Sequence, residues 1–147
     1  MNQQYDETSP VAIGLPVYNG ERYLQDTLRS VLNQTFDNFD LFIADNASTD
    51  RTEEICRDYA GRDSRIQYIR NPINLGASKN YTVCFEPARS RYFRWQNADD
   101  PIEPSLIERC FEVLEADPGV VLAYGKTHII DEKGELTEEY EDNLELI

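Results

Sequence analysis

The sequence is short of several residue types that mark particular classes of protein. Among its 147 residues there are three cysteines, Cys56, Cys84 and Cys110, and a single histidine, His128. The cysteines form no C-x-x-C pair, and each lies in a segment with helical spacing. We therefore interpret them as small buried hydrophobes in a reducing compartment, an interpretation strongly favoured over a disulfide or a cysteine metal site. His128 lies in an expected strand, where a structural role is favoured over ligation.

Positive charge and long apolar runs are also scarce. Lys and Arg number 14 against 28 Asp and Glu, which gives a formal net charge of −14. Nucleic acids and anionic lipid surfaces both require a basic protein surface, so neither is expected as a partner of this segment. Residues 1–10 contain no secretory h-region, and no apolar run approaches the length of a transmembrane helix. We expect a cytoplasmic location, with peripheral association at the inner face of the membrane only through missing parts of a longer protein.

What the sequence does contain is a regular alternation of strand-like and helix-like segments. The apolar run at residues 11–18 is continuous, as in a strand buried on both faces. The expected strands are residues 11–18, 39–44, 66–69, 92–96 and 120–130, and the expected helices are residues 21–34, 50–59, 77–86 and one near Pro104. This alternation predicts an α/β fold with a mostly parallel, doubly wound sheet and helices on both faces. Trp95, in the fourth strand, is expected in the core.

Polar and acidic side chains follow three of the expected strands. In an open parallel sheet, ligands bind beyond the carboxyl ends of the strands. The side chains at these ends are Pro16, Tyr18 and Asn19, then Asp45 and Asn46, then Asn97, Asp99 and Asp100. Because the three ends meet at one edge of the sheet, we expect these residues to form a single site.

The chemistry of these residues indicates a metal-assisted nucleotide site. The adjacent carboxylates of Asp99 and Asp100 repel each other unless a positive charge lies beside them, and Mg²⁺ or Mn²⁺ on a diphosphate would supply it. A nucleobase could pack near Pro16 and Tyr18, and Asp45 could accept a ring N–H such as that of uracil or thymine. Asp99 could accept from a ribose hydroxyl while Asp100 ligates the metal, which would offset charge on the leaving group.

Structural interpretations of the same residues remain open. Asp45 is equally consistent with a cap for its own loop. Asp99 or Asp100 is equally consistent with an N-cap for the last expected helix. Taken alone, Tyr18 is more typical of a packed aromatic residue, and Lys79 of a solvated helix face.

Four segments together resemble the family 2 glycosyltransferases with the GT-A fold. They are residues 11–20 (VAIGLPVYNG), 43–52 (IADNASTDRT), 74–80 (NLG followed by KN) and 97–100 (NADD). The order and spacing of the segments agree with the family over about residues 11–131. The resemblance implies transfer of a sugar, mostly with inversion, from a nucleotide diphosphate donor to an acceptor hydroxyl.

The resemblance also assigns roles to individual positions. Pro16 and Tyr18 would line the nucleoside site, with Asn19 beside them, and Asp45 would read the base, with Asn46 beside it. Asp99 and Asp100 match the last two positions of the acidic motif that touches ribose and metal.

Two positions depart from the family pattern. Asn97 stands at the first acidic position and offers an oxygen without charge. Lys79 stands where an arginine is usual and keeps the charge without the bidentate fork, and we expect it to contribute to the donor site.

The resemblance sets the expected domain organisation. Residues 1–10 would be a flexible N-terminal segment, residues 11–131 the nucleotide-sugar-binding GT-A domain, and residues 132–147 an acidic tail that begins a missing acceptor-side half. An inverting transfer needs a general base, which we expect beyond residue 147. The expected function is transfer from a UDP- or dTDP-sugar to a carbohydrate or lipid-linked acceptor in polysaccharide biosynthesis, with this chain supplying the donor-binding half.

Two other functions are consistent with parts of the sequence. A non-catalytic module would bind nucleotide sugars without the base. A receiver-like phosphoacceptor domain also uses an alternating α/β sheet with clustered aspartates, but here the acidic pair follows the fourth strand and not the first.

Overall fold

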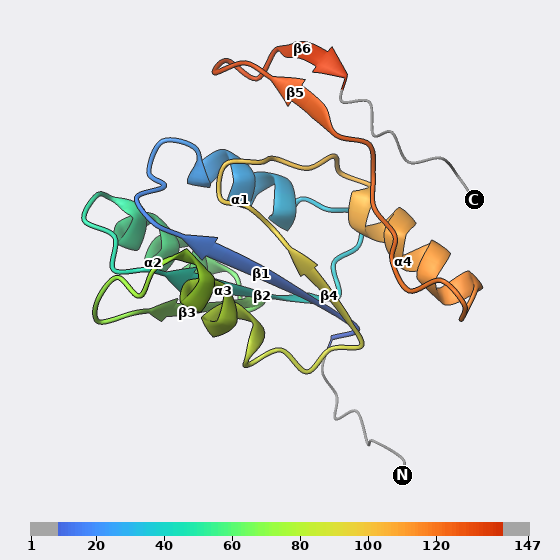
Figure 1. Ribbon diagram of the computed structural model, residues 1–147, viewed down its shortest axis with the longest axis horizontal. Coiled ribbons are helices and arrows are strands. Elements are labelled where there is room, and N and C mark those ends of the chain that lie inside the picture. Colours follow the sequence, from blue (N-terminus) through green and yellow to red (C-terminus); the bar gives the residue numbers. More distant parts are fainter. Residues whose placement is uncertain (1–8, 140–147) are drawn as a thin grey trace. The chain divides into compact units, whose positions relative to one another are not determined.

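A computed structural model of the chain describes residues 9–139 (Figure 1). The expectations for residues 1–8 and 140–147 lie outside the described residues. The chain divides into two compact units, Met1–Ser105 and Leu106–Ile147. Each unit is described by itself below.

The first unit is built on a four-stranded parallel sheet. Its strands are β1 (Val11–Val17), β2 (Phe39–Asp45), β3 (Ile66–Arg70) and β4 (Tyr92–Trp95), in the order β3-β2-β1-β4. The mostly parallel sheet predicted from the sequence is therefore confirmed. The chain order reverses between β1 and β4, and such a switch point opens a crevice at the carboxyl ends of the strands.

Three helices connect these strands. They are α1 (Leu24–Leu32), α2 (Thr52–Arg62) and α3 (Ala77–Phe85). Helices α1 and α2 contact each other, whereas α3 contacts β1 and β2 (Figure 1). Because parallel crossovers are right-handed, the connections through α1 and α2 cover one face and the returning connection through α3 covers the other. Helices lie on both faces, as the alternation of segments predicted.

The two central strands form the core. Ile13 and Leu15 of β1, and Leu41 and Ile43 of β2, are fully buried. This burial follows from their position between layers, because a central strand of a doubly wound sheet is covered on both faces. The continuous apolar run at the start of the chain predicted this placement.

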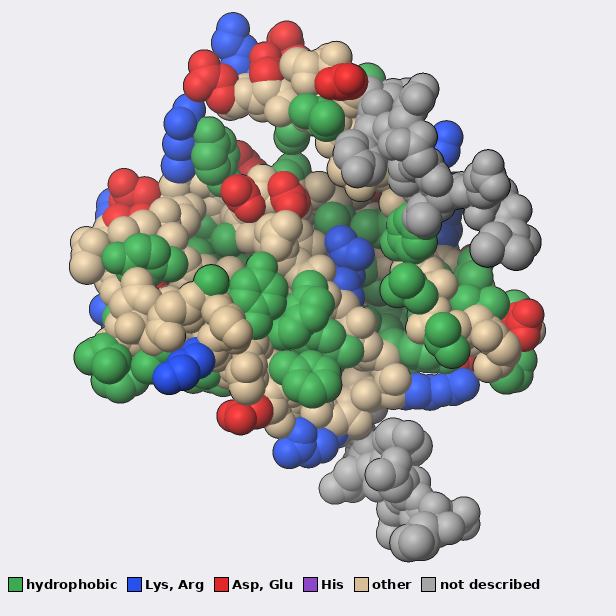
Figure 2. Space-filling view, viewed as in Figure 1, with side chains coloured by type: hydrophobic (Ala, Val, Ile, Leu, Met, Phe, Trp, Pro, Cys, Tyr) green, Lys and Arg blue, Asp and Glu red, His purple; other side chains and the backbone are tan. Residues whose placement is uncertain are grey.

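Aromatic side chains from α3 and β4 pack together at the edge of the sheet. The ring centroids of Tyr81 and Trp95 are 4.8 Å apart, those of Phe93 and Trp95 4.7 Å, and those of Phe85 and Phe93 5.0 Å. Figure 2 shows hydrophobic side chains gathered on this face. The expectation that Trp95 is a core residue is wrong, because β4 is an edge strand and 41% of Trp95 is exposed.

The second unit contains α4 (Leu106–Ala116), β5 (His128–Ile130) and β6 (Leu136–Glu139). Strands β5 and β6 pair antiparallel around a turn at residues 131–134. The expected strand at residues 120–130 is confirmed only over its last three residues. Val121 is 93% exposed, and no described strand pairs with residues 120–127. Apolar β-propensity alone does not make a strand, because the backbone groups need a pairing partner.

Helix lengths and composition also bear on membrane insertion. Across residues 9–139, none of the helices is both long enough and apolar enough to cross a bilayer.

Candidate functional site

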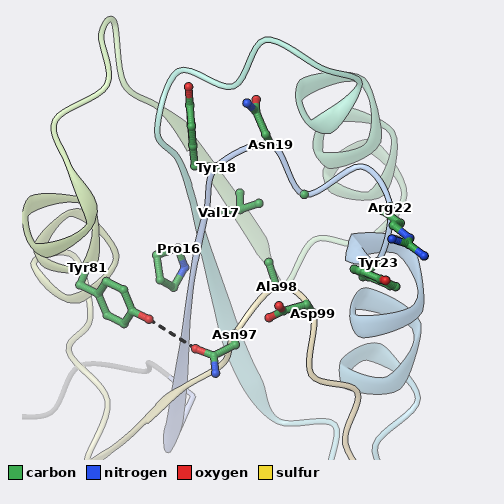
Figure 3. Close-up of a pocket in the computed structure, with 11 residues that line it drawn as sticks. Pro16, Val17, Tyr18, Asn19, Arg22, Tyr23, Tyr81, Asn97, Ala98 and Asp99 are labelled. Atoms are coloured by element: carbon green, nitrogen blue, oxygen red, sulfur yellow. Dashed lines mark hydrogen bonds between the residues drawn. The ribbon is translucent and has the colours of Figure 1, made fainter. Parts of the chain in front are cut away.

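A cavity of about 470 Å³ opens where β1 and β4 end (Figure 3). This is the crevice expected at the switch point of the strand order. The described residues that line it are Pro16, Val17, Tyr18, Asn19, Gly20, Arg22, Tyr23, Tyr81, Asn97, Ala98 and Asp99. Five residues predicted for the nucleotide-sugar site are among them: Pro16, Tyr18, Asn19, Asn97 and Asp99.

The loop after β1 is fixed by the loop after β2. The backbone N–H of Asn19 donates to Ser48 Oγ (2.9 Å), and Asn19 Oδ1 accepts from the N–H of Thr49 (2.8 Å). The N–H of Gly20 donates to Thr52 Oγ1 (2.8 Å). Asn19 has a φ of 52°, a left-handed conformation that asparagine tolerates better than most residues. These bonds hold the floor of the cavity between two strand ends.

A tight turn after β4 carries the acidic residues. The fully buried Gln96 donates from Nε2 to the carbonyl oxygens of Asn97 (3.0 Å) and Asp100 (2.5 Å). Asn97 Nδ2 donates to Asp100 Oδ2 (2.6 Å), while Asn97 Oδ1 accepts from the Tyr81 hydroxyl (3.3 Å). Asp99 is exposed and lines the cavity. The turn therefore presents the Asp99 carboxylate to the cavity and holds Asp100 against Asn97.

Three residues of the cavity wall lie outside the segments that the sequence analysis singled out. Tyr81 reaches the cavity from α3, whereas Arg22 and Tyr23 reach it from the turn that precedes α1, on the opposite side in Figure 3. Arg22 is the one basic residue among the described residues that line the cavity, and its guanidinium lies 4.8 Å from the centroid of the Tyr23 ring. No sequence signal marks Arg22, since it lies just before an ordinary amphipathic helix. Tyr81 directly follows the Lys79-Asn80 motif, which could have indicated it.

Asp45 lies at the end of β2, as predicted, but it is fully buried. Its Oδ1 accepts from the N–H of Ser48 (2.8 Å), and its Oδ2 accepts from the Tyr68 hydroxyl (2.8 Å) and from Arg70 Nη1 (2.7 Å). Burial and the hydrogen bond to Asp45 raise the pKa of the Tyr68 hydroxyl. Asp45 therefore does bond to its own loop, as one interpretation predicted. Contact with a base stays a prediction, and because Asp45 is fully buried it requires a covering group to move.

Asn46 is the centre of a buried amide network. Its Oδ1 accepts from the N–H of Leu75 (2.8 Å) and from Asn71 Nδ2 (3.1 Å), and its Nδ2 donates to Asn74 Oδ1 (2.9 Å). Asn71 Nδ2 also donates to Asn80 Oδ1 (2.8 Å). The network joins the ends of β2 and β3 to the start of α3, which carries Tyr81. Asn46 thus supports the site from beneath, and a direct contact with nucleotide stays a prediction.

Two further predicted residues do not line the cavity. Lys79 is exposed on α3, and Asp100 is exposed with its carboxylate turned to Asn97. Their roles in binding donor and metal stay predictions.

The oxygen donors of the acidic turn fit a hard divalent cation. Mg²⁺ and Mn²⁺ prefer oxygen ligands, and Mg²⁺ is usually held by one or two carboxylates together with substrate phosphates and water. Asp99 and Asp100 supply two carboxylates on one turn, and Asn97 adds an amide oxygen. Within residues 9–139, no group of three or more His, Cys, Asp or Glu side chains forms a complete metal cage. The donor set suits a cation shared with a diphosphate.

The fold and the placement of the cavity define the class of protein. The structure superposes with a TM-score of 0.67 on S. aureus TarS in complex with UDP, at 23% identity, covering 72% of this chain and 32% of that one. It superposes equally well, with a TM-score of 0.67, on a mannosyltransferase from Pyrobaculum calidifontis in complex with GDP-Man and Mn²⁺, at 20% identity, covering 79% and 35%. The fold is therefore that of the GT-A glycosyltransferases.

Sequence comparison assigns the family within that class. Residues 12–144 match the family described as Glycosyl transferase family 2, and the chain belongs to it. An uncharacterised glycosyltransferase of Methanocaldococcus jannaschii is 32% identical over 132 residues, which are 88% of this chain and 46% of the relative. Glycosyltransferase GlyG of Streptococcus pneumoniae is 27% identical over 113 residues, which are 76% and 38%. The chain thus spans less than half the length of these curated relatives.

Proposed function

We propose that this chain forms the donor-binding part of a glycosyltransferase that takes a nucleotide diphosphate sugar, with UDP- or dTDP-sugars favoured. The observation that carries the proposal is the cavity at the β1–β4 switch point, which joins Pro16 and Tyr18 to Asp99. An aromatic, partly apolar end and an acidic end within one cavity suit a ligand with a base at one side and a metal-bound diphosphate at the other.

In this proposal the nucleoside lies against the end of β1. Tyr18 is 51% exposed, so its ring is available to a base, and Pro16 and Asn19 lie beside it in the same wall. Asp45 is the proposed acceptor for a ring N–H of the base. Because Asp45 is fully buried beneath donors such as Tyr68 and Arg70, a covering group would have to move before a base could reach it. Asn46 would keep the loop in place.

The diphosphate would lie toward the acidic turn and the start of α1. Asp99 and Asp100 are the proposed metal ligands, with Asn97 as an oxygen donor beside them. A bound Mg²⁺ or Mn²⁺ would offset the charge that builds on the leaving diphosphate. Arg22 adds a positive charge to the cavity wall, and Lys79 on α3 is a second candidate to meet phosphate.

The rest of the reaction would use groups outside this chain. We propose transfer with inversion to a hydroxyl of a carbohydrate or lipid-linked acceptor, as a step of polysaccharide biosynthesis in the cytoplasm or at the inner face of the membrane. A general base must take the proton of that hydroxyl. We assign this role to none of the side chains in residues 9–139.

Calorimetric titration tests the donor site. We expect UDP or dTDP to bind the 147-residue chain more tightly with Mn²⁺ than with EDTA. Asp99→Asn should lower the affinity for the nucleotide in Mn²⁺ by at least about tenfold and leave the affinity in EDTA unchanged. The expected size follows because even residues that only position a metal ligand contribute that much. Asp26→Asn is the matched control, since Asp26 is exposed on α1 and pairs with Arg29. Absence of binding by UDP, dTDP and GDP with Mn²⁺ would reject the proposal.

A non-catalytic binding module is the second candidate, because the chain spans less than half of its relatives. A radiolabelled UDP-sugar separates the two functions. Sugar released or transferred by the chain would exclude the module.

A further inference from the structure

We propose that Asn97 makes the acidic turn stable without a cation, and so sets how strongly this site depends on the metal. The inference rests on the proposed function, because it concerns the same turn. In the structure the side-chain amide of Asn97 lies against the Asp100 carboxylate and so takes the place of a cation beside it. Its Nδ2 donates to Asp100 Oδ2 at 2.6 Å.

The acceptor-only carboxylate of Asp100 fixes the orientation of this amide, and the Tyr81 hydroxyl bonds its other side. Asn97 Oδ1 accepts from the hydroxyl of Tyr81 at 3.3 Å. Rotation of the amide by half a turn would place Oδ1 against the Asp100 carboxylate, where two acceptors face each other. The Tyr81 ring is in turn packed on Trp95, with centroids 4.8 Å apart. The amide is therefore a positioned donor to Asp100.

The backbone of the turn is closed by the protein as well. Gln96 is 1% exposed and donates to the carbonyl oxygens of both Asn97 and Asp100. Gln96 thus fixes the backbone of the turn, and Asn97 fixes the Asp100 carboxylate. Asp99 is the acidic side chain of the turn that lines the cavity. The turn is thus ordered before any metal or nucleotide binds.

A carboxylate at position 97 would reverse this situation. Aspartate has nearly the shape of asparagine, but it is acceptor-only when ionised and cannot donate to Asp100. Two like charges at hydrogen-bond distance disfavour the folded turn unless a cation lies between them. Asn97→Asp should therefore convert a preorganised turn into one that needs a divalent ion to close.

Thermal unfolding without nucleotide tests the inference. In EDTA, Asn97→Asp should lower the melting temperature by about 3–6 °C, a shift expected for loss of one hydrogen bond to a charged group in a chain of this size. Millimolar Mn²⁺ or Mg²⁺ should restore most of this loss in the variant and change the wild type little. Asn38→Asp is the matched control, because Asn38 is exposed and receives the same change of charge; Mn²⁺ should not restore any loss there.

A variant with the two groups exchanged protects the test against a failure to fold. Asn97→Asp combined with Asp100→Asn again pairs one amide with one carboxylate, and it should melt near the wild-type temperature in EDTA. The inference is overturned if Asn97→Asp melts like the wild type in EDTA, if Mn²⁺ raises its melting temperature no more than that of the wild type, or if the exchanged variant is no more stable than Asn97→Asp.

Nucleotide affinity provides the second readout. The ratio of UDP affinity in Mn²⁺ to that in EDTA should be at least about tenfold larger for Asn97→Asp than for the wild type, and an equal ratio would count against the inference. The two proposals fail separately. A chain that binds no nucleotide rejects the proposed function while the melting experiment still reports on the turn, and unchanged melting rejects the role of Asn97 alone.

Discussion

Two cysteine thiols lie in the interior, where the absence of water changes their chemistry. Cys56 and Cys84 are fully buried, as expected of small hydrophobes in helices, whereas Cys110 is partly exposed. Burial raises the pKa of the Cys84 thiol to about 12. Burial, together with the nearby carboxylates of Asp45 and Asp50, raises the pKa of the Cys56 thiol to about 12 as well.

These raised pKa values predict a loss of stability at alkaline pH. Below pH 9 the folded and unfolded chains both hold the two thiol protons, and the contribution to stability is complete. Between pH 9 and about 12 only the unfolded chain loses them, so the free energy of unfolding should fall by at most about 1.4 kcal/mol per thiol and pH unit. Urea unfolding at pH 8, 9.5 and 10.5 measures the slope.

The control for this prediction is a variant in which Cys56 and Cys84 are both alanine. We expect it to be less stable at pH 8, but its stability should fall less steeply with pH, with Tyr68 contributing to the remaining slope because its pKa is raised. Parallel curves for the two proteins would contradict the assignment to the thiols.

The surroundings of Asp45 could be predicted from the sequence only in part. The sequence predicted that Asp45 ends a strand and approaches the edge where ligands bind. It could not predict that Tyr68 and Arg70 would occupy Oδ2, because those contacts depend on the register of β3 against β2, in which Asp45 pairs with Arg70. Hydrophobic patterns determine which face a strand buries, but not which polar partners meet across it.

At the scale of elements, β1 is packed so closely that one position admits no side chain. A Cβ on Gly14 would lie 2.7 Å from Cζ of Phe93 and 3.0 Å from both Cβ of Cys84 and Cζ3 of Trp95. Gly14→Ala should therefore lower the free energy of unfolding by about 1–3 kcal/mol, since the aromatic rings of β4 must shift. Urea denaturation measures the change.

Gly61 in α2 offers the opposite case within the same protein. Nothing lies within 4 Å of a Cβ placed there, and the residue is helical. Gly61→Ala should raise stability by about 0.5–1 kcal/mol, because alanine loses less backbone freedom in a helix than glycine. Equal effects of the two substitutions would contradict the packing argument for β1.

Elements with strong periodicity were predicted well, and their ends less well. The helix expected at residues 21–34 is α1, but it begins at Leu24 because the carbonyl of Gly20 accepts from the N–H groups of Tyr23 and Leu24 in a preceding turn. The helix expected at residues 50–59 is α2, but it begins at Thr52: Asp50 accepts from the N–H of Thr52, and Glu53 bonds to Arg57 and Arg70 instead of to the start of the helix. Such competition between partners is invisible in a single sequence.

At the scale of the whole molecule, charge is the dominant feature. The net charge of −14 makes the folded chain repel itself, and salt screens this repulsion within a Debye length of about 10 Å at 0.1 M. Salt also weakens exposed ion pairs such as Arg29–Asp26, but each contributes less than about 1 kcal/mol. We expect the melting temperature to rise by a few degrees between 20 and 300 mM NaCl. The measurement is made in EDTA so that trace metal does not contribute, and a fall would show that the ion pairs outweigh the repulsion.

The sequence predicted the architecture better than it predicted the site. Alternating segments were sufficient for the parallel sheet, the helices on both faces and the edge where polar residues gather. Five of the predicted nucleotide-sugar residues line one cavity. Arg22 and Tyr23 could not be predicted, because they lie in the turn between β1 and α1, and the course of that turn depends on tertiary packing.

The bonds between the loops after β1 and β2 have a consequence for protein engineering. Side chains of each loop accept hydrogen bonds from backbone N–H groups of the other. Asn19 accepts from Thr49, and Ser48 accepts from Asn19. Glu21 accepts from the N–H of Arg51, and Asp50 accepts from the N–H of Glu21. A chimera that exchanged one loop alone would leave the donors of the other without acceptors. Recombination between relatives should therefore keep both loops from one parent, so that residues 18–23 and 46–52 are inherited as a single block.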